Sequence, residues 1–376
     1  MPCWSSRPRG IPSLSMACFP ENFDPDGPTQ HSGIFGLPED LNAPLIPILP
    51  VPWEATCSYG TGTAQGPHAI LRASHQVDLE DPYFGPIWKK GIQLLPPSPL
   101  LTELAPHAHN SATTLRQCGT PMDSARAPAH RAVIQGLSSL RTDLVRDWVF
   151  PRLRTQRPGV LGGDHSCALG AFLALEKQGL PFSVLQIDAH LDLRETYEGF
   201  VESHASVMFN LLDRCDHLVS LVQLGIRDFS ASERALAQSH PKAFPFFLPT
   251  WRRKIQEGHP FLELLENALG ALHQRIWISL DIDGLEPSLC PHTGTPVPGG
   301  FSFEEVSLLF EFLSEKGFEV LGFDLCEVAP EPLATQPQNA WEEWDALVGA
   351  RILYKLCGTV TAPHSPNNLR HARTPW

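Results

Sequence analysis

The sequence is poor in basic residues. Its 28 lysines and arginines face 41 aspartates and glutamates, which gives a formal net charge of −13. A basic surface is the usual footprint of nucleic-acid binding and of attachment to anionic membranes, so this composition argues against both. The chain also lacks any run near the roughly 18 apolar residues that a membrane-spanning helix needs. We therefore expect neither nucleic acid nor a membrane among its partners.

Paired cysteines are missing as well. The nine cysteines are odd in number and none has C-x-x-C spacing, which disfavours a disulfide framework or a zinc ribbon. The first residues also lack the apolar core of a secretory signal. We expect reduced, mostly buried thiols, Cys167 among them, in a cytoplasmic protein. Whether the natural chain starts at Met1 or at Met16 stays open.

Proline is abundant instead. The 37 prolines are about twice the usual share of roughly 5%, while 42% of the residues are hydrophobic. This combination predicts stiff connections around a globular body. We expect an irregular N-terminal arm over residues 1–40, one domain over 41–360 and a tail over 361–376. Within the domain, the Pro-, Ser- and Thr-rich stretch near 92–125 is predicted to be a low-order insertion.

The order of apolar segments predicts the fold class. Short apolar runs, typical of buried strands, alternate with helix-length segments through most of the chain. This alternation is typical of a parallel sheet covered by helices on both faces. The prediction is a single-domain, three-layer α/β/α fold with a mainly parallel sheet. The expected strands lie near residues 45–52, 159–165, 182–190, 218–226, 275–283 and 319–328.

Polar residues stand where several of these runs end. Asp188, His190 and Asp192 alternate along one run, so their side chains should project to one side, as should those of Asp281 and Asp283. The carboxyl ends of parallel strands meet at one edge of a sheet, where ligands bind in such folds. We therefore expect His165, from a neighbouring run, to join this group.

Four of these side chains are carboxylates, which would repel one another without a cation. Two divalent ions would balance their charge and could lower the pKa of a shared water toward neutrality. Nitrogen and oxygen ligands without thiolate favour an ion such as manganese over structural zinc. Each motif alone has a plain alternative: a helix cap at Asp164, a solvated strand end, or an Asp-Gly turn. Their coincidence at one sheet edge favours a metal site.

Four motifs together resemble the ureohydrolase (arginase/agmatinase) family: GGDHS, DAHLD, SLDIDGLEPS and TGTPVPGG. The resemblance extends from about residue 45 to 357, outside the arm and the 92–125 stretch. It implies an arginase-like fold, a dinuclear site for Mn²⁺ or Ni²⁺, and a homotrimer or homohexamer. The implied metal ligands are His165, Asp188, His190, Asp192, Asp281 and Asp283.

The resemblance also implies an activity, the hydrolysis of a guanidinium or amidine group, commonly with release of urea. By motif match, Asp192 would accept a hydrogen bond from the attacking hydroxide and Glu327 would bind the guanidinium group. His204 would pass a proton to the leaving amine and contact the substrate. The plain alternatives are a solvated carboxylate at Glu327 and a helix-capping histidine at His204.

The substrate is harder to predict. The segment LRETYEGFVESHAS departs from the arginase pattern, which argues against L-arginine. Thr61 or Thr63 and Trp341 or Trp344 could shorten the pocket, which would favour free guanidine as the substrate. One of the tryptophans would then face the guanidinium cation. Agmatine and guanidino acids are the alternatives. All six ligands of a two-metal site are present in the sequence. Their presence disfavours a non-catalytic relative, which would usually lack one or more of them, and a deacetylase, which would bind a single zinc ion.

Overall fold

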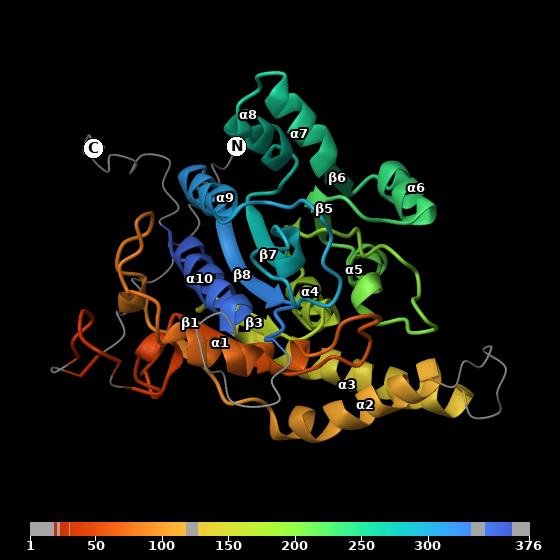
Figure 1. Cartoon of the computed structure of the whole chain (residues 1–376), viewed down its shortest axis with the longest axis horizontal. Coiled ribbons are helices and arrows are strands. Elements are labelled where there is room, and N and C mark those ends of the chain that lie inside the picture. The colour runs from red at the N-terminus through yellow and green to blue at the C-terminus, as the bar shows by residue number, and fades with distance from the viewer. Residues whose placement is uncertain (1–18, 21–22, 30, 118–126, 332–342, 363–376) are drawn as a thin grey trace, which may run out of the picture.

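The structure is a computed structural model that describes residues 19–20, 23–29, 31–117, 127–331 and 343–362 (Figure 1). Its centre is one sheet of eight parallel strands in the order β2-β1-β3-β8-β7-β4-β5-β6. This confirms the predicted parallel α/β fold. The strands are β1 (Ile46–Val51), β2 (Ile92–Leu94), β3 (Gly159–Gly162), β4 (Phe182–Ile187), β5 (Leu218–Ile226), β6 (Ala243–Phe247), β7 (Arg275–Asp281) and β8 (Glu319–Cys326).

Helices cover both faces of the sheet, as the continuous apolar strands predicted. The apolar core divides into two main clusters because strand side chains alternate between faces. Ile276 and Ile278 of β7 join the cluster that includes α1 and α7–α10, whereas Trp277 joins the one that includes α2–α6. The helices are α1 (Gly66–Ser74), α2 (Pro99–Gln117), α3 (Ala127–Arg152), α4 (Leu169–Gln178), α5 (Val207–Arg214), α6 (Ala231–Ser239), α7 (Leu248–Gln256), α8 (Phe261–Leu269), α9 (Phe303–Glu315) and α10 (Trp344–Thr359).

The prediction of a low-order insertion at 92–125 was wrong for most of that stretch. Residues 92–94 form edge strand β2, and α2 follows and packs beside α3 (Figure 1). Leu101, Ala108 and Ala112 of α2 are buried at helical spacing, so packing against α3 outweighs the composition. Pro106 lies inside the helix although it has no N–H to donate. Residues 118–126 lie outside the described part.

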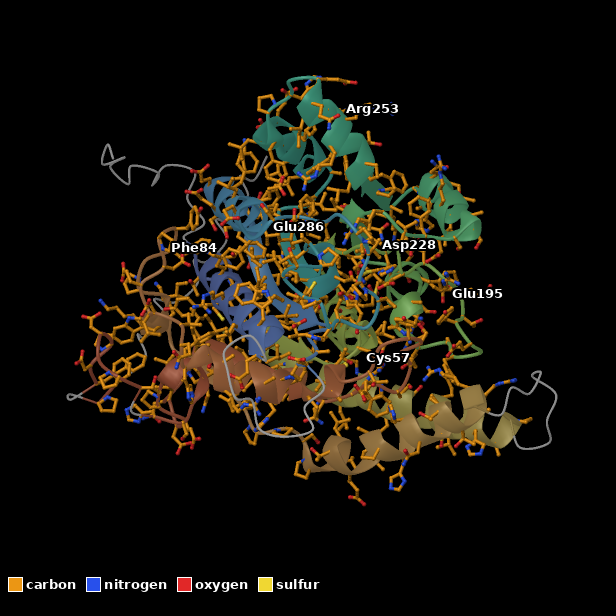
Figure 2. The ribbon with its side chains drawn as sticks, in the orientation of Figure 1. Cys57, Phe84, Glu195, Asp228, Arg253 and Glu286 are labelled. Atoms are coloured by element: carbon orange, nitrogen blue, oxygen red, sulfur yellow. The ribbon has the colours of Figure 1, made fainter. Side chains whose placement is uncertain are left out.

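The end of the predicted arm belongs to the core. Ile34, Phe35 and Leu37 are buried, and the first two lie in the short 3₁₀ turn η1 (Ile34–Gly36). The ring of Phe35 packs edge-on against Tyr354 of α10, with centroids 4.8 Å apart. Figure 2 shows side chains filling the space between the sheet and its helices. Among the described residues, no helix combines the length and apolar character needed to cross a membrane.

The strand order decides where the predicted site residues meet. β3, β8, β7 and β4 are consecutive in the sheet, and all run in one direction. Their carboxyl ends precede the segments that begin at Gly163, Glu327, Ile282 and Asp188. The topology therefore brings four segments, far apart in sequence, to one edge of the sheet.

Candidate metal centre

The structure brings all six predicted ligands into one place. His165, Asp188 and Asp281 form one group of potential ligand atoms within 4.8 Å of one another, and Asp188, His190 and Asp283 form a second. Asp188 belongs to both. Asp192 lies beside the first group, with its Oδ2 atom 3.0 Å from Nδ1 of His165. Every one of these residues except His190 is buried.

Local backbone geometry supports this arrangement. A side chain at Gly163 would collide with the carbonyl oxygen of Trp53, 1.9 Å from an added Cβ, so the chain can pass here only as glycine. Asp192 and Glu327 adopt positive φ angles of 53° and 63°. Non-glycine residues rarely take this conformation, and such strain is typical of functional sites.

The carboxylates are crowded enough to retain protons. Burial, and then the charge of Asp188, raise the pKa of Asp192 to about 7. Burial, and then the charges of Asp283 and Asp188, raise the pKa of Asp281 well above its usual range. Asp188 behaves differently: burial would raise its pKa, but hydrogen bonds from His165 and His190 lower it overall.

The pKa values of the two histidines are also raised, although burial by itself would lower them. Burial alone would lower the pKa of His165, but hydrogen bonds to Asp188 and Asp192 raise it well above its usual value. For His190, burial is likewise outweighed, in this case by the charge of Asp283 and a hydrogen bond to Asp188. Retained protons thus balance part of the negative charge of the cluster. Its buried nitrogen and oxygen donors fit divalent metal ions.

A chain of hydrogen bonds orients His165. Ser279 donates its hydroxyl proton to Asp324 over 2.8 Å, so its oxygen accepts from Nε2 of His165 at 2.9 Å. Nδ1 of His165 then faces Asp188, Asp192 and Asp281 as the potential ligand atom. Such outer contacts fix the tautomer of metal-binding histidines. Ser279 was missed in the sequence, although it lies two residues before Asp281 on the same side of β7.

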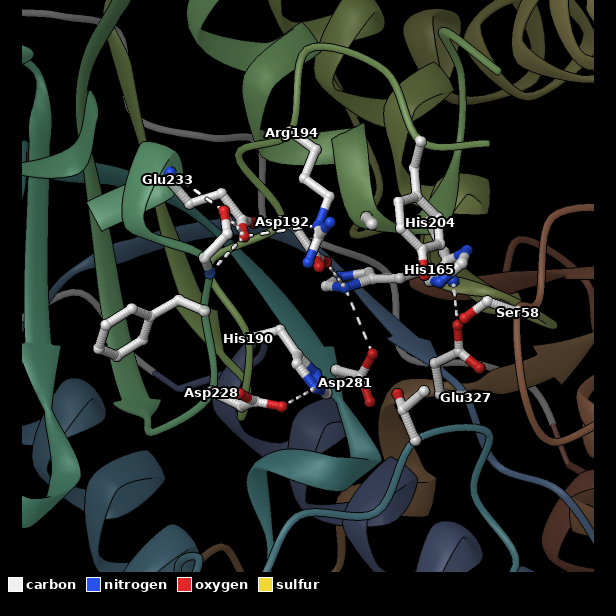
Figure 3. A pocket seen from close by; sticks show the side chains of 15 residues that line it. Ser58, His165, His190, Asp192, Arg194, His204, Asp228, Glu233, Asp281 and Glu327 are labelled. Atoms are coloured by element: carbon white, nitrogen blue, oxygen red, sulfur yellow. Dashed lines mark hydrogen bonds and ion pairs between the residues drawn. The ribbon is translucent and has the colours of Figure 1, made fainter. Parts of the chain in front are cut away.

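The cluster opens into a cavity of about 250 Å³ (Figure 3). Glu327 and His204, both predicted site residues, line it. Glu327 is buried, and one of its oxygens accepts from the backbone N–H of His165 at 2.9 Å. Burial, and then the charge of Asp164, raise the pKa of Glu327 well above its usual range. Burial lowers the pKa of His204 to about 4, so its ring is neutral near neutral pH.

The remaining wall comes largely from residues that sequence reasoning missed. The guanidinium of Arg194 lies over the ring of Tyr197 at 4.7 Å, with its Nε 3.5 Å from Glu233. Asp228 follows β5, and its carboxylate lies 3.9 Å from Nε2 of His190. A search for polar residues just after the predicted strand 218–226 would have found Asp228. The missed lining residues are Ser58, Arg194, Tyr197, Ala205, Asp228, Phe229, Ser230, Glu233 and Thr295.

The other predicted substrate contacts are not brought to this wall. Thr61 is exposed, and the described lining does not include it. Thr63 is buried, with its hydroxyl 3.6 Å from Sγ of Cys57. The indole N–H of Trp344 donates to the carbonyl of Ser288 at 2.9 Å. Trp341 lies outside the described residues. Cys167 is buried in the core, as predicted.

Metal affinity is expected to rise steeply with pH. The raised pKa values of Asp192, Asp281, His165 and His190 mean that the metal-free site holds protons near neutrality, and a metal ion must displace them. Each displaced proton weakens binding about tenfold per pH unit below the pKa of its group. Titration calorimetry with Mn²⁺ between about pH 6 and 8, in buffers of different ionisation enthalpy, should show proton release. Affinity independent of pH across this range would contradict the expectation.

Residues 45–358 match the Arginase family. The chain is 33% identical over 288 residues to an N(1)-aminopropylagmatine ureohydrolase of Thermus thermophilus, and the matched region covers 76% of this chain and 83% of that protein.

Solved structures share the fold. Agmatine ureohydrolase of Thermoplasma volcanium superposes with a TM-score of 0.61 at 22% identity, over 84% of this chain and 90% of the other. Trypanosoma cruzi formiminoglutamase, solved with Mn²⁺, gives 0.62 at 18% identity, over 85% and 95%.

Proposed function

This chain belongs to the Arginase family, and from that premise we propose that it hydrolyses a small guanidino amine to urea and a diamine. As a member of this family, the protein is a metal-dependent ureohydrolase that acts on guanidino compounds. The main support is structural. Two groups of potential metal ligands share Asp188, and Glu327 lines the cavity into which this cluster opens.

The six predicted ligands would hold two divalent ions, Mn²⁺ or Ni²⁺. When bound, such ions offset the carboxylate charge and supply an activated water near neutral pH. Glu327 would hold the guanidinium group by a charge-assisted hydrogen bond, which fixes the carbon for attack. His204, whose ring is neutral near neutral pH, would take up a proton from the attacking water and pass it to the departing amine. Asp192 would orient the attacking water.

The outer wall of the cavity fits a substrate whose guanidinium group carries an aliphatic chain with a terminal ammonium. Tyr197 and Phe229 offer apolar surface for methylene groups, and Asp228, whose side chain is 66% exposed, offers a carboxylate for a terminal ammonium. The name of the Thermus relative also refers to a guanidino amine. The prediction of free guanidine depended on a pocket shortened by Thr61 or Thr63 and by Trp341 or Trp344. It remains the second candidate because the cavity, at about 250 Å³, is smaller than most ligand pockets.

A urea-release screen tests this proposal directly. Purified protein loaded separately with Mn²⁺ or Ni²⁺ would be given agmatine, free guanidine, guanidinobutyrate and L-arginine. We expect kcat/KM to be highest for agmatine with at least one metal. Faster turnover of guanidine would select the second candidate, and no urea from any substrate would reject the function. The homotrimer or homohexamer and the cytoplasmic location stay predictions.

Replacing Asp228 with asparagine should separate the two substrates. Loss of one carboxylate facing an ammonium should raise KM for agmatine about tenfold, because charged hydrogen bonds are worth about 1.5–3 kcal/mol and partial exposure weakens this one. Steady-state kinetics with guanidine, which has no tail, should be unchanged. Equal losses for both substrates would contradict a tail-binding role and would indicate that Asp228 acts through His190, 3.9 Å away.

A further inference from the structure

The side chain of His204 has a partner that the predicted mechanism does not use. The hydroxyl oxygen of Thr56 lies 3.1 Å from the backbone nitrogen of His204 and 3.4 Å from its Nδ1. Thr56 stands in the segment after β1, so this contact spans 148 residues of sequence. Thr56 is fully buried, which makes its hydrogen bonding strongly constrained.

We propose that Thr56, held by Asp164, is a positioning residue that fixes the tautomer of His204 with the proton on Nδ1. The proposal deepens the proposed function, on which the proton-transfer role of His204 rests. Thr56 does not reach the substrate in this scheme. It acts only through the imidazole that lines the cavity.

The direction of the hydrogen bonds follows from counting protons. A threonine hydroxyl has one proton to donate and can accept two. The Thr56 hydroxyl donates this proton to Oδ2 of Asp164 at 3.0 Å. The oxygen of Thr56 is then an acceptor for the backbone N–H and the Nδ1–H of His204. Nε2 is left with the lone pair, ready to take a proton from the cavity.

Asp164 is itself rigidly held. The same Oδ2 atom accepts from the backbone N–H of Thr56 at 3.1 Å, while Oδ1 accepts from the hydroxyl of Ser166. That hydroxyl in turn accepts from the guanidinium of Arg141, a fully buried residue of α3. Nη1 of Arg141 also lies 4.0 Å from Oδ1 of Asp164. Both oxygens of Asp164 thus accept hydrogen bonds within a closed, buried network, and such networks specify one geometry.

Arg141 is fixed from its other side as well. Its Nη2 lies 3.8 Å from Glu202 and donates to the hydroxyl of Thr142 at 3.1 Å, and Thr142 donates to Glu202 at 2.7 Å. Glu202 lies two residues before His204. The network therefore ties the segment that carries His204 to α3, to the end of β3 and to the segment after β1.

One competing donor is present. The hydroxyl of Ser203 lies 3.5 Å from the same Nδ1 and could donate to it, which would place the ring proton on Nε2. Ser203 already accepts from the backbone N–H of Ala205 at 3.2 Å as the cap of η5 (His204–Ser206). We favour Thr56 because its hydroxyl proton is committed to a carboxylate and its oxygen also accepts from the backbone of His204.

The test compares two substitutions of Thr56 in the full chain loaded with metal. Thr56→Val keeps the shape and removes the hydroxyl, so kcat should fall about tenfold or more, a part of the roughly 10²–10⁴-fold that a positioned proton-transfer group contributes, with KM and metal content unchanged. Thr56→Ser should restore most of the activity. Thr359→Val, at a buried threonine of α10 remote from the cavity, is the matched control and should behave as wild type.

A second measurement does not depend on catalysis. ¹⁵N-histidine NMR of the full chain loaded with diamagnetic Zn²⁺, with His204 assigned by its loss in His204→Asn, should show the Nδ1–H tautomer in wild type and a mixture in Thr56→Val. An Nε2–H tautomer in wild type, or Thr56→Val within twofold of wild-type kcat, would overturn the proposal. A wild-type protein that releases no urea would reject the proposed function instead, and the NMR result would still decide the tautomer.

Discussion

Replacing Asp188 with asparagine is expected to abolish urea release and metal binding together. Asp188 is the one residue common to both three-residue groups, so one amide removes a charged ligand from each. Outer contacts of metal sites alone are worth about 10–100-fold in affinity, and a shared carboxylate should be worth more. We expect kcat/KM to fall by about 10³-fold or more, with less than one metal ion bound per chain by elemental mass spectrometry.

Asp213→Asn is the matched control because Asp213 is an exposed carboxylate of α5, away from the cavity. It should retain wild-type activity and metal content. Thermal unfolding of both metal-free variants should show that each is folded. An Asp188→Asn protein that retains two ions and more than a tenth of the activity would contradict the shared-ligand assignment.

The gathering of the candidate metal ligands could be predicted from sequence because these residues stand at two-residue spacing where predicted strands end. Asp188, His190 and Asp192 alternate after one strand, and Asp281 and Asp283 alternate at the end of another. The two-residue spacing predicted that each set would share one side. Only Asp281 lies within a strand, however: Asp283 belongs to a 3₁₀ turn that follows β7, and the other three residues follow the end of β4, with a positive φ of 53° at Asp192. The two sets meet because the strands are parallel, which the alternation of strands and helices predicts. The strand order then makes β4 and β7 direct neighbours.

Residues that reach the site only through contacts between distant parts of the chain could not be predicted in this way. Asp164 was considered as a helix cap, and it does precede the 3₁₀ turn η4 (His165–Ala168). Its side chain makes no capping hydrogen bond there and instead accepts from Thr56, 108 residues away. No spacing rule links residues so far apart. The contact exists only because β1 and β3 are neighbours in the sheet.

The failure at α2 has a different cause. Proline, serine and threonine are poor helix formers, so composition alone favoured a low-order segment over 92–125. Leu101, Ala108 and Ala112 nevertheless share one face of a helix, and α2 packs beside α3, so tertiary packing outweighs the cost of the unfavourable residues, which is about 3 kcal/mol for an interior proline such as Pro106. A search for 3.6-residue periodicity in this stretch would have indicated the helix.

Glu327→Gln is expected to impair every guanidino substrate equally. The amide has the same shape, and its oxygen can still accept from the backbone N–H of His165, so the local structure should persist. The negative charge that would face the guanidinium is lost, however, in a buried position where solvent does not screen it. At about 1.5–3 kcal/mol for each charged hydrogen bond, and two such bonds to a planar cation, kcat/KM should fall about 10²-fold or more.

The pattern of this loss distinguishes Glu327 from the other site residues. Glu327 belongs to neither ligand group, so the variant should bind metal like wild type, unlike Asp188→Asn. Its effect should be the same for agmatine and guanidine, unlike that of Asp228→Asn, because the guanidinium is common to both substrates. Glu315 is an exposed residue of α9, so Glu315→Gln should change neither metal binding nor kcat/KM. Loss of metal in Glu327→Gln, or unchanged kcat/KM, would show that this carboxylate supports the ligands and does not hold the substrate.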